Sequence, residues 1–130
     1  MKIETPKVQV QKSATELFNS LGDVSNFEKL MPDNIAKFEV LGDESFVFGL
    51  KGMPEIKLKV KEKVAPNKIV LASASDKLAF ALIANITEVS ANASEVGLSF
   101  EGEFNAMMGM MIKGPITKFM ESLSSNMQKL

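Results

Sequence analysis

The sequence predicts an α+β domain in which one strand and two short helices precede about six antiparallel strands and a long terminal helix. Apolar and polar residues alternate in short runs between residues 35 and 104, which is the period of half-buried strands. From about residue 105 to 130, apolar residues recur every three or four positions, as on one face of a helix. A Ser-x-x-Glu capping box near the start marks a change from strand to helix. This order is typical of a helix lying on a curved antiparallel sheet of about seven strands.

The first segment supplies the opening strand and both short helices. Valines alternate with glutamines over residues 8–10, which predicts a half-buried strand. Ser13 and Glu16 then form the capping box that opens a helix with an apolar side. Asp23 is placed to cap a second short helix, which Pro32 ends. The apolar residues of the two helices are Leu17, Phe18, Leu21, Phe27, Leu30 and Met31.

The middle of the chain reads as successive hairpins separated by turn residues. The clearest strand is "IKLKVKEKV" at 56–64, where Ile56, Leu58 and Val60 alternate with lysines. We expect these three residues to face the terminal helix and the lysines to face solvent. Two interpretations of the lysine row remain open, an attraction for anionic lipid headgroups and an ordinary solvated strand face. The row consists of Lys57, Lys59, Lys61 and Lys63.

The terminal segment has the spacing of a long amphipathic helix, interrupted by Gly114 and Pro115. Proline removes one backbone hydrogen bond, so a kink or break is expected near residues 111–114. The dipeptide is either a hinge that lets the first half of the helix move or a static bend that fits the helix to the sheet. The residues on its apolar face are Met108, Ile112, Ile116, Phe119, Leu123, Met127 and Leu130.

Composition excludes several classes of function. The chain of 130 residues is long enough for one domain, 1–130, and no linker divides it. The net charge of −1 does not suit a nucleic-acid-binding protein. Cys, His, Trp, Tyr and Arg are all absent, which removes thiolate and imidazole nucleophiles, the commonest general base and most zinc, haem and iron–sulfur ligand sets. Any catalysis would have to use Asp, Glu, Lys, Ser, Thr or backbone groups. We expect no metal and no cofactor. The start does not read as a signal peptide and no apolar run is long enough to span a membrane, so a cytoplasmic protein is expected.

The order of elements and the residues at their joints resemble the START-like superfamily, also called SRPBCC or birch-pollen-allergen-like. The stretch "SATELFNSLGDVSNFEKLMP", the hairpins and the "F-N-x-M" start of the last helix carry the resemblance, which covers the whole chain. It implies a helix-grip fold, in which a bent sheet grips the C-terminal helix around a hydrophobic ligand cavity. In such a fold Met53, between two strands, is either a gate at the cavity mouth or a turn residue with no role. Members bind lipids, sterols or polyketides, and a minority are cyclases or dehydratases.

Five of the nine methionines lie in "NAMMGMMIKGPITKFM", residues 105–120. A thioether copper site would normally need His or Cys partners, so we expect no metal here. Methionine at helical spacing fills a core or forms an adaptable wall for an apolar ligand. The spacing is interpreted as placing Met108, Met111 and Ile112 on the inner face, with Met107 and Met110 toward the flanks.

Glu62 is the weak candidate for a catalytic residue. Strict alternation from Ile56 places it on the inward face, where a buried carboxylate is a possible acid or a polar anchor. A β-bulge or a strand end would instead let it reach water.

The function predicted from these observations is the binding or carriage of a lipid-, sterol- or polyketide-like molecule between the sheet and the last helix. The alternatives are a cyclase- or dehydratase-type enzyme using Glu62 and a protein-interaction module with a filled core. The expected partner is a hydrophobic small molecule, with no nucleic acid and no integral membrane segment, and the chain is expected to be a monomer or weak homodimer. Candidate wall residues are Phe27, Met31, Phe38, Phe46, Phe48, Leu58, Val60, Leu71, Phe80, Leu82, Phe100, Met108, Met111, Ile112, Ile116 and Phe119.

Overall fold

The computed structural model describes residues 2–33, 35–42, 44–51, 55–73, 80–104 and 106–130, and Met53 lies outside them. Eight strands form one antiparallel sheet: β1 (Lys2–Glu4), β2 (Val8–Val10), β3 (Ile35–Gly42), β4 (Ser45–Leu50), β5 (Ile56–Val64), β6 (Lys68–Ser73), β7 (Phe80–Ser90) and β8 (Ala93–Gly102). The helices are α1 (Ala14–Gly22), the 3-10 helix η1 (Val24–Leu30), α2 (Ala106–Asn126) and the short 3-10 helix η2 (Met127–Lys129). The predicted α+β layout is confirmed.

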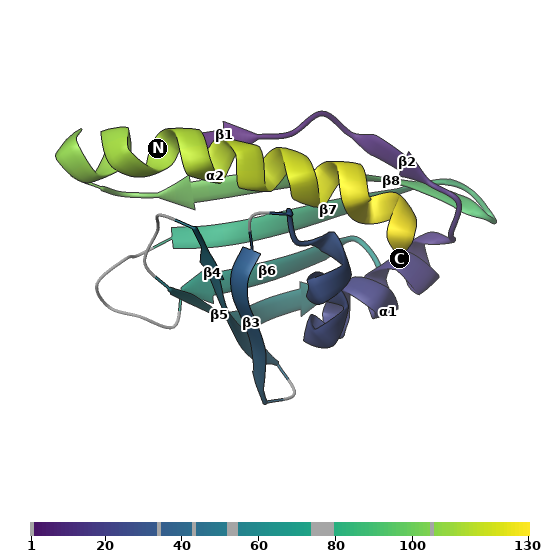
Figure 1. Ribbon diagram of the computed structural model, residues 1–130. Helices are drawn as coiled ribbons and strands as arrows, with labels where there is room; N and C mark the ends of the chain where they lie inside the picture. Colours follow the sequence, from purple (N-terminus) through teal and green to yellow (C-terminus); the bar gives the residue numbers. More distant parts are fainter. Residues whose placement is uncertain (1, 34, 43, 52–54, 74–79, 105) are drawn as a thin grey trace.

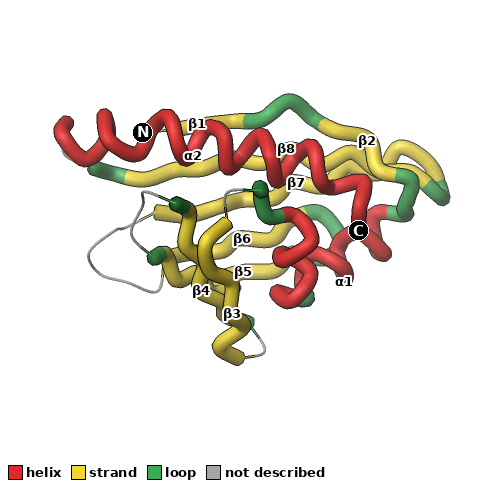
Figure 2. Tube along the Cα trace, in the orientation of Figure 1, coloured by secondary structure: helices red, strands yellow, loops and turns green. Residues whose placement is uncertain are grey.

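The sheet curves around the terminal helix. Its strand order is β1-β8-β7-β6-β5-β4-β3, with β2 also paired to β8. Figure 1 shows α2 running along the β1–β8–β7 side of the sheet, while β3 to β6 turn away beneath it and α1 and η1 close one end. Figure 2 shows the same division, with the helices on one side of the curved sheet. The enclosed face holds a single hydrophobic core.

The strand predicted at residues 8–10 is present as β2, and a further strand, β1, precedes it, with Thr5, Pro6 and Lys7 between the two. Both strands pair with β8, so they act as one interrupted edge strand. Proline cannot donate to a ladder, and edge strands are where sheets tolerate it. The Thr5 hydroxyl accepts a hydrogen bond from the Leu98 N–H at 3.1 Å, which continues the contact with β8 through a side chain.

The predicted caps form. The Ser13 hydroxyl accepts a hydrogen bond from the Glu16 N–H at 3.1 Å and donates one to the Glu16 carboxylate, with 3.2 Å between the two oxygens. Asp23 accepts hydrogen bonds from the Ser25 hydroxyl at 2.6 Å and from the Ser25 N–H at 3.1 Å. These bonds, the hydroxyl bond first, lower the pKa of Asp23 because they stabilise the charged carboxylate.

Strand β5 follows the predicted alternation only as far as Val60. Ile56 and Leu58 are buried and Val60 is partly buried, while the lysines between them are exposed. A register shift between Val60 and Glu62 then moves the strand out of strict alternation. Glu62 is consequently exposed. The interpretation of Glu62 as an inward carboxylate is wrong, and the β-bulge accounts for it.

Helix α2 continues through Pro115 without a break. The helix extends from Ala106 to Asn126, so the predicted break near residues 111–114 does not occur. Proline lacks the N–H that would donate to the carbonyl of Met111, and Met111 lies on the exposed side, where water can replace that donor. Because Pro115 is itself exposed, its ring displaces no core side chain.

Candidate functional site

Where described residues enclose it, the interior of the domain is nearly filled. The void under η1 and the central strands has a volume of about 10 Å³, room for about one water-sized sphere. Its lining is apolar: Leu21, Phe27, Ile69, Leu71, Leu82, Ala84 and Leu98. A hollow of this size does not hold a lipid or a sterol.

Aromatic packing explains why little space is left. The rings of Phe27, Phe38 and Phe48 surround Phe46, with centroids 5.1, 5.3 and 6.1 Å from it. Phe48 in turn stacks on Phe119 of α2, with centroids 4.7 Å apart and planes inclined by only 7°. This stack joins the terminal helix directly to β4.

Most of the predicted wall residues lie in this core. Eleven are buried: Phe27, Met31, Phe46, Phe48, Leu58, Leu71, Leu82, Phe100, Ile112, Ile116 and Phe119. Phe38, Val60, Phe80 and Met108 are partly buried and pack against them.

Met111 departs from the prediction. Its side chain is 66% exposed, so it does not share the inner face with Ile112, which is 7% exposed. Consecutive helical residues are turned by about 100°, whereas Met108 and Ile112, four apart, lie almost above one another. Met107 and Met110 are exposed, as expected.

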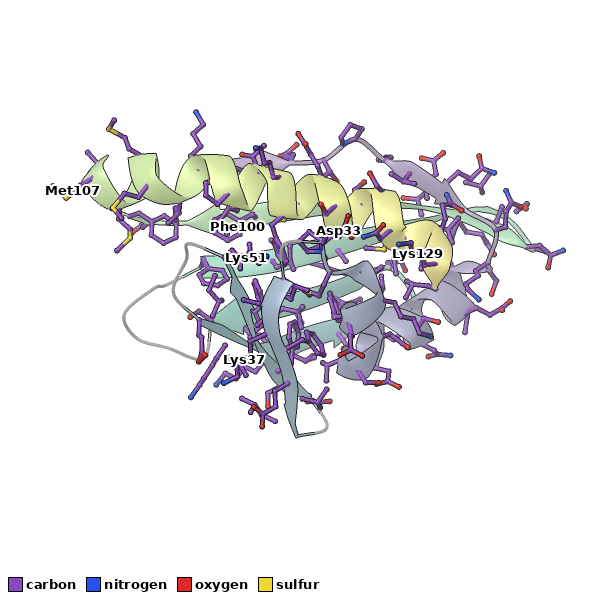
Figure 3. The ribbon with its side chains drawn as sticks, in the orientation of Figure 1. Asp33, Lys37, Lys51, Phe100, Met107 and Lys129 are labelled. Carbon is purple, nitrogen blue, oxygen red and sulfur yellow. The ribbon has the colours of Figure 1, made fainter. Side chains whose placement is uncertain are left out.

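A much larger hollow than this void lies beside α2 rather than beneath it. A depression of about 500 Å³ is bounded by Leu50, Lys51, Gly114, Pro115 and Phe119, together with Pro32, Asp33, Lys118 and Ser122. The last four also line an adjoining depression of about 570 Å³ that continues toward the end of the chain past Glu121, Ser125, Asn126 and Lys129. We name this continuous surface the α2 groove. Figure 3 shows Asp33 and Lys51 near the middle of α2 and Lys129 near its C-terminal end.

One side chain fixes the two walls of the α2 groove relative to each other. The Asn126 amide donates hydrogen bonds to the carbonyls of Leu30, at 3.0 Å, and Met31, at 3.5 Å. These bonds join the end of α2 to the end of η1, just before Pro32. The two walls are therefore tied together at this end by a polar bridge.

The α2 groove combines an apolar end with a charged one. Leu50, Pro115 and Phe119 form its apolar wall, with Lys51 at the edge. Among the described residues the salt bridges involve Lys2, Lys37 and Lys63, so none of the three groove lysines, Lys51, Lys118 and Lys129, has a carboxylate partner there.

Sequence reasoning did not identify the polar part of the α2 groove. A usable signal was present, since Met111, Pro115, Lys118 and Ser122 follow the i, i+4, i+7, i+11 spacing of one helical flank. What the sequence could not provide is the opposite wall, which comes from residues 32–33 and 50–51.

Two further searches of the described residues gave negative results. No group of three or more Asp or Glu side chains is arranged to hold a metal ion in the part of the chain the structure describes. Nor does any described helix combine the length and apolarity needed to cross a bilayer.

The curved sheet around a C-terminal helix, with α1 and η1 closing one end, defines a START-like helix-grip fold. Solved structures with the same fold are similar to this chain over nearly its whole length. Truncated norcoclaurine synthase from Thalictrum flavum matches 99% of this chain and 91% of its own at a TM-score of 0.77 and 13% identity. A START superfamily protein from Mycobacterium smegmatis matches 98% of this chain and 97% of its own, at a TM-score of 0.69 and 11% identity. A conserved protein from Geobacillus kaustophilus matches 99% of this chain and 93% of its own, at a TM-score of 0.68 and 12% identity.

These likenesses establish the fold and extend over nearly the whole of each chain. Another structure of the Thalictrum flavum synthase, with a TM-score of 0.75, holds dopamine and hydroxybenzaldehyde. No protein-family model matches the sequence, and no curated protein matches it.

Proposed function

We propose that the protein binds a largely apolar small molecule at the junction of α2 and the sheet, with the α2 groove as its seat. The observation that carries this proposal is the 500 Å³ depression in which Leu50, Pro115 and Phe119 face a few polar groups. Small-molecule sites are typically concave, of roughly 300–1,000 Å³, and mostly apolar with a small number of polar groups that fix orientation.

The groove chemistry favours an amphipathic ligand. An apolar part would lie against Pro115 and Phe119, and Lys51 and Lys118 would meet an anionic or strongly polar end. Lysine is a flexible point charge, which suits a headgroup whose geometry varies. The START-like resemblance implies a ligand cavity between the sheet and the terminal helix, whereas the proposed site lies on the flank of that helix, next to Leu50 at the end of β4.

A cyclase-type reaction has less support. Glu62, the one carboxylate predicted to reach an inner cavity, is exposed and does not line the α2 groove. The filled core instead favours, as a second candidate, a protein-interaction module with no small ligand.

Two measurements separate these candidates. Organic-solvent extraction of the purified protein followed by mass spectrometry tests for a co-purifying apolar compound. Titration with a fluorescent naphthalene sulfonate, an apolar anion, tests the groove itself. Ser122→Trp should weaken probe binding about tenfold or more by occupying the groove, which corresponds to about 1.4 kcal/mol or more. Thr87→Trp, at an exposed position on β7, is the matched control and should leave binding unchanged.

Equal probe binding by the parent and both variants would place the site elsewhere. No extracted compound and no probe binding by the parent would refute the ligand proposal and leave the interaction module.

A further inference from the structure

The first turns of α2 carry the most exposed large apolar side chains among the described residues. Met107 is 74% exposed, Met110 83% and Met111 66%, whereas the next most exposed, Val89 and Leu41, reach 49% and 48%. Single exposed apolar residues are ordinary, but a contiguous group on one element marks an interaction site.

This group occupies a projecting end of the molecule. Figure 1 shows the first turns of α2 extending past the sheet, and Figure 3 places Met107 at the tip. The first buried residue of the helix is Ile112. We name the exposed side chains of Met107, Met110 and Met111 the methionine tip.

The charges behind the methionine tip are positive. Lys113 and Lys118 are exposed on the next turns, and the sequence from residue 104 to 120 contains no Asp or Glu. Glu103 precedes the helix and Glu121 is the first acid after it. The N-terminus of a helix also carries the positive end of its dipole, which adds to the attraction for anions.

We infer that the methionine tip inserts into the surface of an anionic lipid bilayer. Along a helix rising 1.5 Å per residue, Lys113 lies about 9 Å and Lys118 about 16 Å behind Met107. Interfacial helices bury their apolar part roughly 5–10 Å into the boundary between headgroups and acyl chains. With Met107 at that depth, Lys113 lies close to the headgroup boundary, where its side chain meets the lipid phosphates, and Lys118 lies farther out.

Two other occupants or surfaces fit less well. A second copy of the chain would have to bury about 800 Å² per partner, far more than three side chains provide. The lysine row of β5, Lys57, Lys59 and Lys61, is cationic, but the apolar residues beside it on that face, Val47 and Val70, are buried. It can attract lipid headgroups but has nothing to insert.

The test is co-sedimentation of the full chain with vesicles of phosphatidylcholine alone and of phosphatidylcholine mixed with phosphatidylglycerol. The parent should bind the mixed vesicles, and the M107S/M110S/M111S variant should bind them at least tenfold more weakly, because partial burial of three methionines is lost. Lys113→Gln should weaken binding roughly fivefold, from about 1 kcal/mol per lysine near an anionic surface. Leu41→Ser, which removes an equally apolar exposed side chain elsewhere, should have no effect.

A second measurement distinguishes insertion from adsorption. The chain has no tryptophan, so Met110→Trp introduces a unique fluorophore. Its emission should shift to shorter wavelength on addition of mixed vesicles, while that of Leu41→Trp should not. Circular dichroism of each variant verifies folding, which changes at exposed positions should leave intact.

The inference fails if the parent binds neither vesicle, or if Lys57→Gln/Lys59→Gln abolishes binding that the methionine variant retains. It fails as well if the methionine variant differs from the parent only in oligomeric state. None of the residues changed in these vesicle assays lines the α2 groove. Membrane insertion can therefore be refuted while ligand binding in the groove stands, and ligand binding can be refuted while membrane insertion stands.

Discussion

Replacing Phe119 with alanine tests whether the Phe48 stack holds the terminal helix to the sheet. Phe119 is 4% exposed, and its ring lies 4.7 Å from that of Phe48 at an angle of 7°. Truncating a packed phenylalanine costs about 3–5 kcal/mol through lost transfer free energy and a new cavity. One side of Phe119 borders the α2 groove, where it has fewer partners, so we expect the lower end, about 3 kcal/mol.

Urea unfolding measures this loss, and Met111 supplies the comparison on the same helix. Met111→Ala removes a side chain that is 66% exposed and should change the free energy of unfolding by less than about 0.5 kcal/mol. For a domain whose total stability is about 5–15 kcal/mol, the two variants should be readily distinguished.

A double-mutant cycle isolates the stack itself. Phe48→Leu and Phe119→Leu keep both positions apolar, so the coupling between them should report the ring contact, about 0.5–1.5 kcal/mol. Zero coupling, or losses of similar size for Phe119→Ala and Met111→Ala, would refute the reasoning that this contact anchors the helix.

Three further results are expected. Pro115→Ala should raise the free energy of unfolding in urea by about 2 kcal/mol. Proline costs about 3 kcal/mol within a helix, and its restriction of the unfolded chain offsets only about 1 kcal/mol of that cost. A destabilised variant would show that contacts of the proline ring stabilise the fold. Ser13→Ala should lower the free energy of unfolding by about 1 kcal/mol through loss of the α1 cap, with Ser20→Ala as the control. Because the pKa of Asp23 is lowered, its carboxylate stabilises the fold at neutral pH, and this contribution disappears as the pH falls through the depressed pKa. Asp23→Asn should therefore be less stable than the parent at pH 7 and equal to it in acid, and a difference that persists in acid would contradict this assignment.

The fold could be predicted because its main signals are local. The Ser13 cap, the alternation of Ile56, Leu58 and Val60, and the helical stripe from Ile112 to Met127 each depend on neighbours within a few residues. In each case the side that the sequence marks as apolar is the side that the structure buries.

The errors arose where a local period was extended across an irregularity. Counting by twos placed Glu62 inside, but a single bulge after Val60 reverses the count. Alternation also fails to predict burial on the outer face of the sheet. Val47 and Val70 lie on the same face as the β5 lysines, and yet they are only 2% and 8% exposed. Long neighbouring side chains on such a face can cover a valine, and that coverage is not encoded in the alternation.

The candidate site was harder to predict than the fold because its walls come from distant parts of the chain. Residues 32–33, 50–51 and 114–129 meet only after the sheet has curved and Asn126 has joined α2 to η1. A flank of one helix can be recognised from spacing, but the surface opposite it depends on tertiary packing.

The distribution of buried residues along α2 assigns different roles to its two ends. From Ile112 onward the helix buries Ile116, Phe119, Met120 and Leu123, so this part cannot leave the sheet without exposing the core. The turns before Ile112 have only the partly buried Met108 packed against the core among their described methionines, and displacing them would cost far less. Both surfaces proposed to bind apolar molecules, the methionine tip and the apolar end of the α2 groove at Pro115, lie at or next to this weakly anchored end. A rigid C-terminal half thus supplies the stability that allows the N-terminal turns to remain exposed.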